Sequence, residues 1–203
     1  MHLDGDQWAA FFGSFEREAF RLETLPAYSM EGEEEEFETF RATGKLELPE
    51  DDPWLVKVRS FRDSGRRIRR VHVVTRPLTD YLRYEFAAYR YNVEAGEDVR
   101  ILDLADRENP GLPDQDFWLF DSSKVVAMNY RSDGTQISRD LLEVPDLNQY
   151  RQWKELALSL SVPFSEYPPG PLRRRLTLHL PERWPWSEDF TQLFSTVHAP
   201  PAL

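Results

Sequence analysis

The stretch of sequence that decides the fold begins with Ile68-Arg69-Arg70-Val71-His72-Val73-Val74-Thr75, continues through Tyr81 to Tyr91, and ends with Val99-Arg100-Ile101-Leu102. The first and last segments are rich in β-branched residues and lie next to Pro or Gly turns, which is typical of strands. The middle segment has apolar and aromatic residues at helical spacing and follows Thr79 and Asp80, which favour a helix start. A strand, a helix and a second strand in this order predict an α/β fold.

More strands are expected on the C-terminal side of this unit. Phe117 to Asp121 and Lys124 to Tyr130 are predicted strands joined by a tight Asp-Ser-Ser turn. Asp133-Gly134 predicts a hairpin turn before a strand over Gln136 to Glu143, and a helix over Asp146 to Ser161 follows. We therefore expect an α/β fold, with α+β as the alternative, in which a mixed sheet of about five to six strands is flanked by helices.

The N-terminal part of the chain predicts a layer of helices. From Asp4 to Arg21 the apolar residues mostly recur three or four positions apart, which indicates one long amphipathic helix. Two shorter helices are predicted over Glu34 to Thr43 and over Trp54 to Ser64. We expect one α/β domain over residues 1–167 and a Pro/Trp-rich C-terminal appendage over residues 168–203.

Composition narrows the chemistry that the chain can perform. The 203 residues include no Cys, which excludes disulfides, zinc thiolate sites and thiol catalysis, and only 4 His. The sequence contains no Gly-x-Ser-x-Gly elbow, no Gly-x-Gly-x-x-Gly loop and no Walker motif. His72 lies in a predicted strand and is interpreted as a core residue in preference to a catalytic base. We therefore expect no catalytic residue, no metal site and no cofactor, and we favour a protein that is not an enzyme.

The net charge of the chain is −11 and is unevenly distributed. Residues 1–60 hold 15 acidic and 6 basic residues, whereas residues 61–80 hold 6 Arg and 2 Asp. A chain this acidic disfavours direct binding to duplex DNA, which depends on clustered Lys and Arg. The alternatives for the local excess of arginine are a solvated helix end and edge strand, or a basic patch for an acidic protein partner. The patch consists of Arg66, Arg67, Arg69 and Arg70.

The sequence pattern predicts no membrane segment. No stretch approaches about 18 consecutive apolar residues, and the first residues, Met1-His2-Leu3-Asp4-Gly5-Asp6, are acidic where a signal peptide would be basic and then apolar. We therefore expect no membrane association and a cytoplasmic location.

Two groups of polar side chains are candidates for a ligand or partner site. The first lies on the helix between the two strands and includes Tyr81, Arg83 and Glu85. The competing interpretation of this group is structural, namely core packing with a salt bridge. For the carboxylates described next, the competing interpretation is that they cap turns. The second group is a set of carboxylates that would converge at strand ends if the sheet is parallel there, and that could then hold a divalent cation or act as an acid–base pair. It consists of Glu94, Glu97, Asp98, Asp114, Asp116 and Asp121.

A set of short motifs is spread over about residues 4–167. The motifs are Phe15-Glu16, Ala19-Phe20-Arg21-Leu22-Glu23, Arg70-Val71-His72-Val73-Val74, Pro77-Leu78-Thr79-Asp80-Tyr81-Leu82-Arg83-Tyr84-Glu85, Asn92-Val93-Glu94-Ala95-Gly96-Glu97-Asp98-Val99-Arg100, Leu112-Pro113-Asp114 and Asp116-Phe117-Trp118-Leu119-Phe120-Asp121. Together they resemble one uncharacterised actinobacterial family that is typical of streptomycetes. The resemblance implies a genomic setting more than a mechanism, because members of the family are often encoded beside helix-turn-helix transcription regulators.

The order of elements around the deciding stretch is also similar to one half of the phospholipase D-like fold. The motif of that family is His, any residue, Lys, four residues and Asp, and at the same spacing this chain has Asp114, Asp116 and Asp121. The resemblance implies a fold without the activity, because carboxylates in place of the nucleophile and the phosphate-binding Lys would repel a phosphodiester.

Two functions follow from these observations. We favour a non-catalytic cytoplasmic binding protein that is an accessory partner in a regulatory circuit with a helix-turn-helix transcription regulator. The alternative is a small-ligand sensor, or an enzyme, that uses a carboxylate and tyrosine pocket on a degenerate phospholipase D-like fold. A pocket that gathers the candidate side chains would favour the alternative, whereas an exposed apolar or Arg-lined surface would favour a protein partner.

Overall fold

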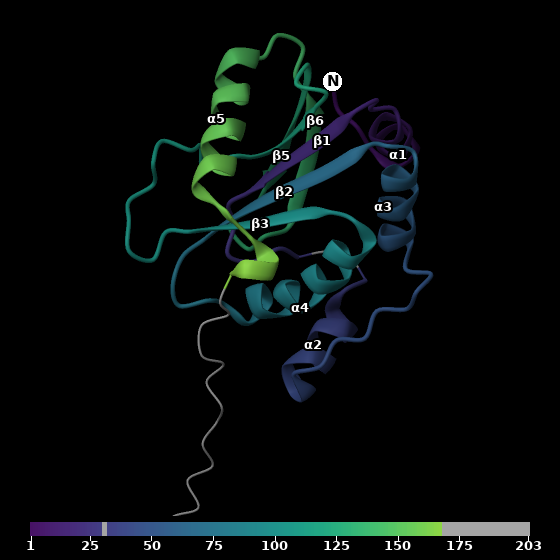
Figure 1. Ribbon diagram of the computed structural model, residues 1–203, viewed down its shortest axis with the longest axis vertical. Coiled ribbons are helices and arrows are strands. Elements are labelled where there is room, and N and C mark those ends of the chain that lie inside the picture. Colours follow the sequence, from purple (N-terminus) through teal and green to yellow (C-terminus); the bar gives the residue numbers. More distant parts are fainter. Residues whose placement is uncertain (30–31, 168–203) are drawn as a thin grey trace, which may run out of the picture. The chain divides into compact units, whose positions relative to one another are not determined.

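The computed structural model describes residues 1–29 and 32–167 and is built around a seven-stranded mixed sheet (Figure 1). The strands lie in the order β6-β5-β4-β1-β2-β3-β7, with β1, β2 and β3 parallel and the other neighbouring pairs antiparallel. This confirms the predicted mixed sheet of an α/β protein. The strands are β1 (Glu18–Glu23), β2 (Arg67–Val74), β3 (Asp98–Asp103), β4 (Asp116–Phe120), β5 (Lys124–Tyr130), β6 (Gln136–Leu141) and β7 (Val162–Pro163).

Helices cover both faces of the sheet. The last α-helix, α5, packs on one face, whereas α1, α3 and α4 pack on the opposite face and α2 lies outside α4 (Figure 1). The side chains of Asp52, Thr79 and Asp146 accept backbone N–H groups at the starts of α3, α4 and α5, which fixes where these helices begin. The helices are α1 (Gly5–Gly13), α2 (Glu34–Thr43), α3 (Pro53–Asp63), α4 (Asp80–Ala95) and α5 (Leu147–Leu160), followed by the short 3-10 helix η1 (Phe164–Glu166).

The two faces of the sheet differ in chemistry. Toward α5, the central strands carry Phe20, Leu22 and Val71, which belong to one apolar cluster. The face toward α3 and α4 is apolar at one end, around Ala19 and Ile68. At its other end the same strands carry charged and polar side chains. Because side chains alternate along a strand, the position of these polar residues is set by the register of β1, β2 and β4.

The predicted long N-terminal helix is wrong in its second half. α1 ends at Gly13, and Glu18 to Glu23 form β1, the central strand of the sheet. All six residues of β1 are buried, so this strand has no alternation of apolar and exposed residues that would identify it. Its Ala19, Phe20 and Leu22 fall at helical spacing from the aromatic residues of α1, which explains the error.

The other predicted helices and strands agree with the structure to within a few residues. α2 and β5 have the predicted bounds, and α4 extends to Ala95, four residues beyond the prediction. The predicted appendage over residues 168–203 lies outside the described residues. Among the helices of residues 1–29 and 32–167, none has the length and apolar character needed to cross a membrane.

Asp121 joins the N-terminal segment to the turn after β4. Its carboxylate accepts the backbone N–H groups of Glu16 and Arg17, each at 2.8 Å, and of Glu18 at 2.9 Å. Partial burial opposes ionisation of Asp121, but these three hydrogen bonds prevail and lower its pKa. The side chain therefore holds the entry to the central strand against β4.

Replacement of Asp121 by Ala should destabilise the protein by about 1–2 kcal/mol, because three backbone N–H groups lose a charged acceptor at a site that water reaches. The pKa of Asp121 is lowered in the folded state, so its stabilisation is present above about pH 4 and is lost as the pH falls through the folded-state pKa. Urea unfolding at several pH values should show the difference between wild type and Asp121→Ala shrinking below about pH 4. Asp114→Ala, which changes an exposed carboxylate near the other end of β4, should show no comparable difference.

Candidate functional site

A row of buried charges crosses the polar end of the sheet. Arg21 on β1 donates from Nη2 to Oδ2 of Asp116 at 2.9 Å, and its Nε lies 3.4 Å from Oε1 of Glu23. Asp116, at the start of β4, also accepts the backbone N–H and the hydroxyl of Thr24 and the hydroxyl of Tyr28. With 1% of its side chain exposed, Asp116 depends on these donors in place of water.

The row continues through β2 to the start of β3. Nη1 of Arg70 lies 3.0 and 3.1 Å from the two carboxylate oxygens of Glu23, and its Nε lies 2.8 Å from Oε1 of Glu97. Glu97 accepts further hydrogen bonds from Asn92 and Trp54. Acidic and basic groups thus alternate along Asp116, Arg21, Glu23, Arg70 and Glu97, which we call the buried charge chain.

Strand register and one glycine bring these five residues together. Glu23 pairs with His72 across β1 and β2, and Arg21 pairs with Arg70, so their side chains share one face of the sheet. Gly96 ends α4 in the left-handed region with φ of 113°, and the N–H of Glu97 turns back to the carbonyl of Asn92 at 2.9 Å. This turn directs Glu97 toward Arg70.

A cavity of about 580 Å³ lies over the buried charge chain. Its base includes Arg21, Glu23 and Arg70, and α4 contributes Tyr81, Tyr84, Glu85, Ala88 and Tyr89 to its wall. Aromatic side chains form much of the remaining wall. This combination of aromatic walls and a few charged groups is typical of small-ligand sites. The other aromatic lining residues are Trp8, Phe12, Tyr28, Trp54, Trp118 and Tyr130.

Helix α2 completes the cavity through tyrosine–glutamate pairs. The hydroxyl of Tyr81 donates to Glu33 at 3.3 Å, and that of Tyr84 donates to Glu36 in a very short contact. Burial raises the pKa of Glu33 and, more strongly, that of both tyrosines. Of the glutamates at the start of α2, Glu34 and Glu35 are exposed, whereas Glu33 and Glu36 face the cavity.

Two buried polar atoms of the cavity lining lack a hydrogen-bond partner in the described part of the chain. They are Nη1 of Arg21 and Oε2 of Glu85. Burial and the charge of Glu23 raise the pKa of Glu85 well above its usual value. Burial likewise opposes ionisation of Glu23, but Arg70 and Arg21 lower its pKa to about 2. The cavity therefore offers an unsatisfied donor at Arg21 and an unsatisfied carboxyl oxygen at Glu85.

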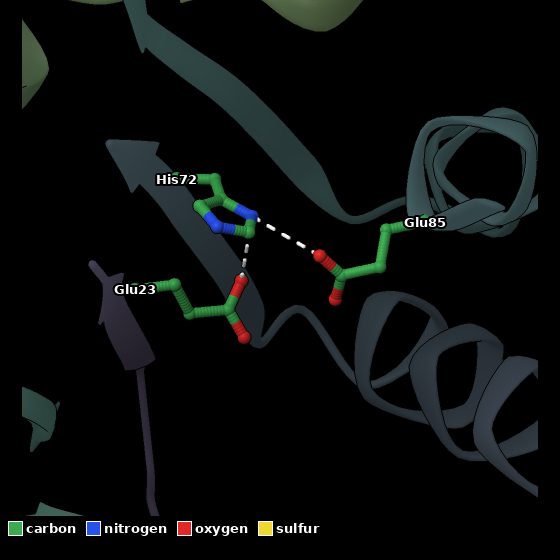
Figure 2. Close-up of side chains that lie close together, drawn as sticks. All are labelled: Glu23, His72 and Glu85. Carbon is green, nitrogen blue, oxygen red and sulfur yellow. Dashed lines mark ion pairs between the residues drawn. The ribbon is translucent and has the colours of Figure 1, made fainter. Parts of the chain in front are cut away.

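His72 lies beside these groups in a defined tautomer. Its Nε2 is 3.0 Å from the carbonyl oxygen of Leu25, which can only accept, so Nε2 carries the proton. Nδ1 is left with a lone pair and accepts the hydroxyl of Tyr89 at 2.8 Å. Burial lowers the pKa of His72, which favours this neutral form. Figure 2 shows the carboxylates of Glu23 and Glu85 directed toward the imidazole.

The structure brings some of the predicted site residues together and separates others. Tyr81 and Glu85 line the cavity, and Asp116 and Glu97 lie at the two ends of the buried charge chain. Arg83 is not among the lining residues and pairs with Asp80 at 2.6 Å.

The six predicted carboxylates do not meet at one edge of the sheet. Asp114 and Asp116 lie at or just before the start of β4, beside the C-terminal end of β1. The other four lie toward the opposite ends of the strands, because β4 runs antiparallel to β1. They are Glu94, Glu97, Asp98 and Asp121. Asp114 lines a separate cavity of about 360 Å³, and Glu94 is exposed. Asp114, Asp116 and Asp121, at the spacing of the phospholipase D motif, thus lie at both ends of β4 and not around one centre.

The predicted basic patch is divided between different surroundings. Arg70 points into the buried charge chain, whereas Arg69 lies on the other face of β2 and pairs with Asp98 at 2.8 Å. Arg66 stacks over Phe61, with its guanidinium carbon 4.4 Å from the ring centroid. Arg67 is exposed. These four arginines therefore do not form one continuous surface.

Sequence analysis missed the centre of the site, Arg21 and Glu23, together with Tyr28 and Tyr130. Once β1 is assigned as a strand, Arg21 and Glu23 fall on one face, two positions apart, in a strand whose six residues are all buried. Charged residues at such positions require buried partners, and that was the available signal. Tyr28 and Tyr130 gave no comparable signal, because their hydrogen bonds to Asp116 and Arg21 join parts of the chain that are far apart in the sequence.

Comparison with known families identifies the chain as a member of an uncharacterised family. A family model described as a domain of unknown function, DUF6879, matches residues 6–169. The chain belongs to this family. No match to the chain was found among the curated proteins. The predicted membership of an uncharacterised family is thereby confirmed.

Replacement of Arg70 by Met should lower the free energy of unfolding by about 3–5 kcal/mol, because it leaves Glu23 and Glu97 buried without their shared cation. Arg69→Met, on the same strand, removes a partly exposed pair and should cost less than about 1 kcal/mol. Urea unfolding followed by circular dichroism measures both values. Equal losses of unfolding free energy in the two variants would show that the buried charge chain contributes no more to stability than a partly exposed ion pair.

Proposed function

We propose that this chain is a non-catalytic, cytoplasmic protein that binds a small polar ligand in the 580 Å³ cavity and communicates its presence to a protein partner. The observation that carries the proposal is the pair of unpartnered buried atoms in the cavity lining, Nη1 of Arg21 and Oε2 of Glu85. A buried donor or carboxyl oxygen without a partner costs about 1–3 kcal/mol. A ligand that satisfies both would recover this free energy on binding.

The lining defines the class of ligand. Nη1 of Arg21 can donate a hydrogen bond to a carboxylate or carbonyl oxygen of the ligand. Oε2 of Glu85 can accept one from an N–H or O–H group of the ligand. Tyrosine and tryptophan rings around the cavity favour a flat or aromatic body between these polar ends. Aromatic amino acids, nucleosides and aromatic carboxylic acids with a hydroxyl or amino group have this distribution of groups.

Binding without catalysis accounts better for the cavity than an enzymatic reaction does. The imidazole of His72 is held between the Leu25 carbonyl and the Tyr89 hydroxyl. Burial raises the pKa values of Tyr28, Tyr81 and Tyr89, so these hydroxyls stay protonated at neutral pH and supply no phenolate base. An enzyme on a degenerate phospholipase D-like fold is the second candidate, but Asp114, Asp116 and Asp121, which lie at the spacing of that motif, do not support it.

The partner in this proposal is a helix-turn-helix transcription regulator. Support for it comes from the resemblance to an actinobacterial family whose members are often encoded beside such regulators. The charge of −11 favours a protein contact over direct binding to duplex DNA. The ligand would act by binding one state of this pair more tightly than the other.

Replacement of Ala88 by Phe should block the cavity, because Ala88 lies in its α4 wall. Ligand-observed NMR with a mixture of aromatic amino acids, nucleosides and hydroxylated aromatic acids should reveal at least one binder to the wild-type chain. Isothermal titration with that compound should show at least a tenfold weaker affinity for Ala88→Phe, which is about 1.4 kcal/mol.

The matched control is Ala87→Phe, which makes the same change one position earlier on α4, outside the cavity lining. Its affinity should equal that of the wild type. The absence of any binder in the mixture, or equal losses in both variants, would count against a ligand site in this cavity. Circular dichroism and thermal unfolding of both variants check that α4 is intact.

A further inference from the structure

At the base of the cavity, three potential metal ligands come together from three elements. Glu23 is the last residue of β1, His72 lies opposite it on β2, and Glu85 reaches down from α4 (Figure 2). Nδ1 of His72 lies 3.4 Å from Oε2 of Glu85 and 3.6 Å from Oε2 of Glu23. One ligand atom from each residue falls within 4.8 Å of the others.

We propose that Glu23, His72 and Glu85 bind a divalent transition-metal ion of the Zn²⁺ class. Zinc bonds to nitrogen and carboxylate oxygen are about 2.0–2.2 Å long, so the ligands of a tetrahedral site are separated by about 3.3–3.6 Å. The two measured separations from Nδ1 match that spacing. One imidazole with two carboxylates suits such an ion better than Mg²⁺ or Ca²⁺, which prefer oxygen ligands throughout.

The hydrogen bonding of His72 supports this assignment. Metal-binding histidines usually donate their second ring N–H to a carbonyl or carboxylate, which fixes the tautomer and the orientation of the ring. Nε2 of His72 does this with the carbonyl of Leu25 at 3.0 Å. Nδ1, the unprotonated nitrogen, is the one that faces the two glutamates.

The charges and hydrogen bonds around Glu85 provide the independent observation. Only 9% of Glu85 is exposed, it lines the cavity, and its Oε2 has no hydrogen-bond partner among residues 1–29 and 32–167. The buried charge chain has one net negative charge, and an ionised Glu85 would increase this to two. A divalent cation cancels that charge and is a partner for Oε2 in place of an N–H or O–H group of the proposed organic ligand.

The fourth position belongs to Tyr89 or to water from the cavity. The Tyr89 hydroxyl is 2.8 Å from Nδ1 of His72 and 3.2 Å from Oε2 of Glu23, so it already contacts two of the three ligand atoms. On metal binding it would give up its hydrogen bond to Nδ1 and bind the ion or a water on it. This inference does not depend on the proposed organic ligand, because the three protein ligands are in place without it.

The test is a titration of the purified full chain, treated with EDTA and dialysed, with Zn²⁺ in competition with a chromophoric chelator. All samples carry His2→Ala, because His2 lies between Asp4 and Asp140 at the surface and could bind zinc there. We expect one equivalent of Zn²⁺ with a Kd of about 1 µM or tighter. Co²⁺ at the same site should give the visible absorption bands of a four-coordinate complex, and Mg²⁺ should not compete.

Glu85→Gln should weaken Zn²⁺ binding by more than about 100-fold. Loss of a residue that only hydrogen-bonds to a metal ligand already lowers metal affinity by about 10–100-fold, and Glu85 would bind the metal directly. It should also abolish the cobalt bands. The matched control is Glu33→Gln, which alters another cavity carboxylate outside the cluster and should leave affinity unchanged. Equal Zn²⁺ affinity in the His2→Ala chain with and without Glu85→Gln, or no stoichiometric binding to the His2→Ala chain shown to be folded, would overturn the proposal. Thermal unfolding confirms that Glu85→Gln folds.

Discussion

The arrangement of this protein depends on how two buried arginines are neutralised. Arg21 and Arg70 lie side by side in the register of neighbouring strands, where like charges would repel each other strongly in a medium of low dielectric constant. Glu23 lies in contact with both, and Asp116 and Glu97 take the outer positions. The charge chain therefore fixes β4, β1, β2 and the turn before β3 relative to one another, and it requires the register that the sheet has.

Such a network is an expensive way to fill a core. Apolar side chains of similar volume often give equal or greater stability than a buried set of ion pairs, because the charges lose their hydration. The opposite face of the same strands is mostly apolar, although Glu18 of β1 pairs there with Lys154 of α5. The charged end is also the end that borders the 580 Å³ cavity. Its placement is consistent with a network that serves binding as well as stability.

The fold was largely predictable because most elements carry local signals. Thr79 and Asp146 cap their helices, Asp133-Gly134 marks a turn, and β2 has a run of β-branched residues. β1 had no such signal, because burial on both faces removes the alternation that identifies a strand. That single error displaced Arg21 and Glu23 from the sheet and hid their partners. Tyr81 and Glu85 were found from their own helix, whereas the contacts of Asp116 and Glu97 required the register between strands.

Helix α2 and the glutamate before it form one side of the cavity with few buried contacts. None of its residues is buried, and it packs on α4 mainly through Phe37 and Phe40, which contact the rings of Tyr81 and Tyr84. The same tyrosines pair with Glu33 and Glu36. Few buried contacts imply a low local free energy of opening. The side of the cavity formed by α2 is therefore held much less firmly than the base formed by the strands.

The two buried cavity atoms that lack a hydrogen-bond partner within the described ranges would bind groups of opposite charge. Arg21 can receive an anionic or carbonyl oxygen, whereas Glu85, with Glu23 and His72, can receive a cation. A metal ion at the glutamates would increase the positive potential above the charge chain and strengthen the attraction of Arg21 for an anionic group. A ligand with a carboxylate could then contact both the ion and Arg21. The organic ligand and the metal would in that case bind cooperatively, because each reduces the electrostatic cost of the other.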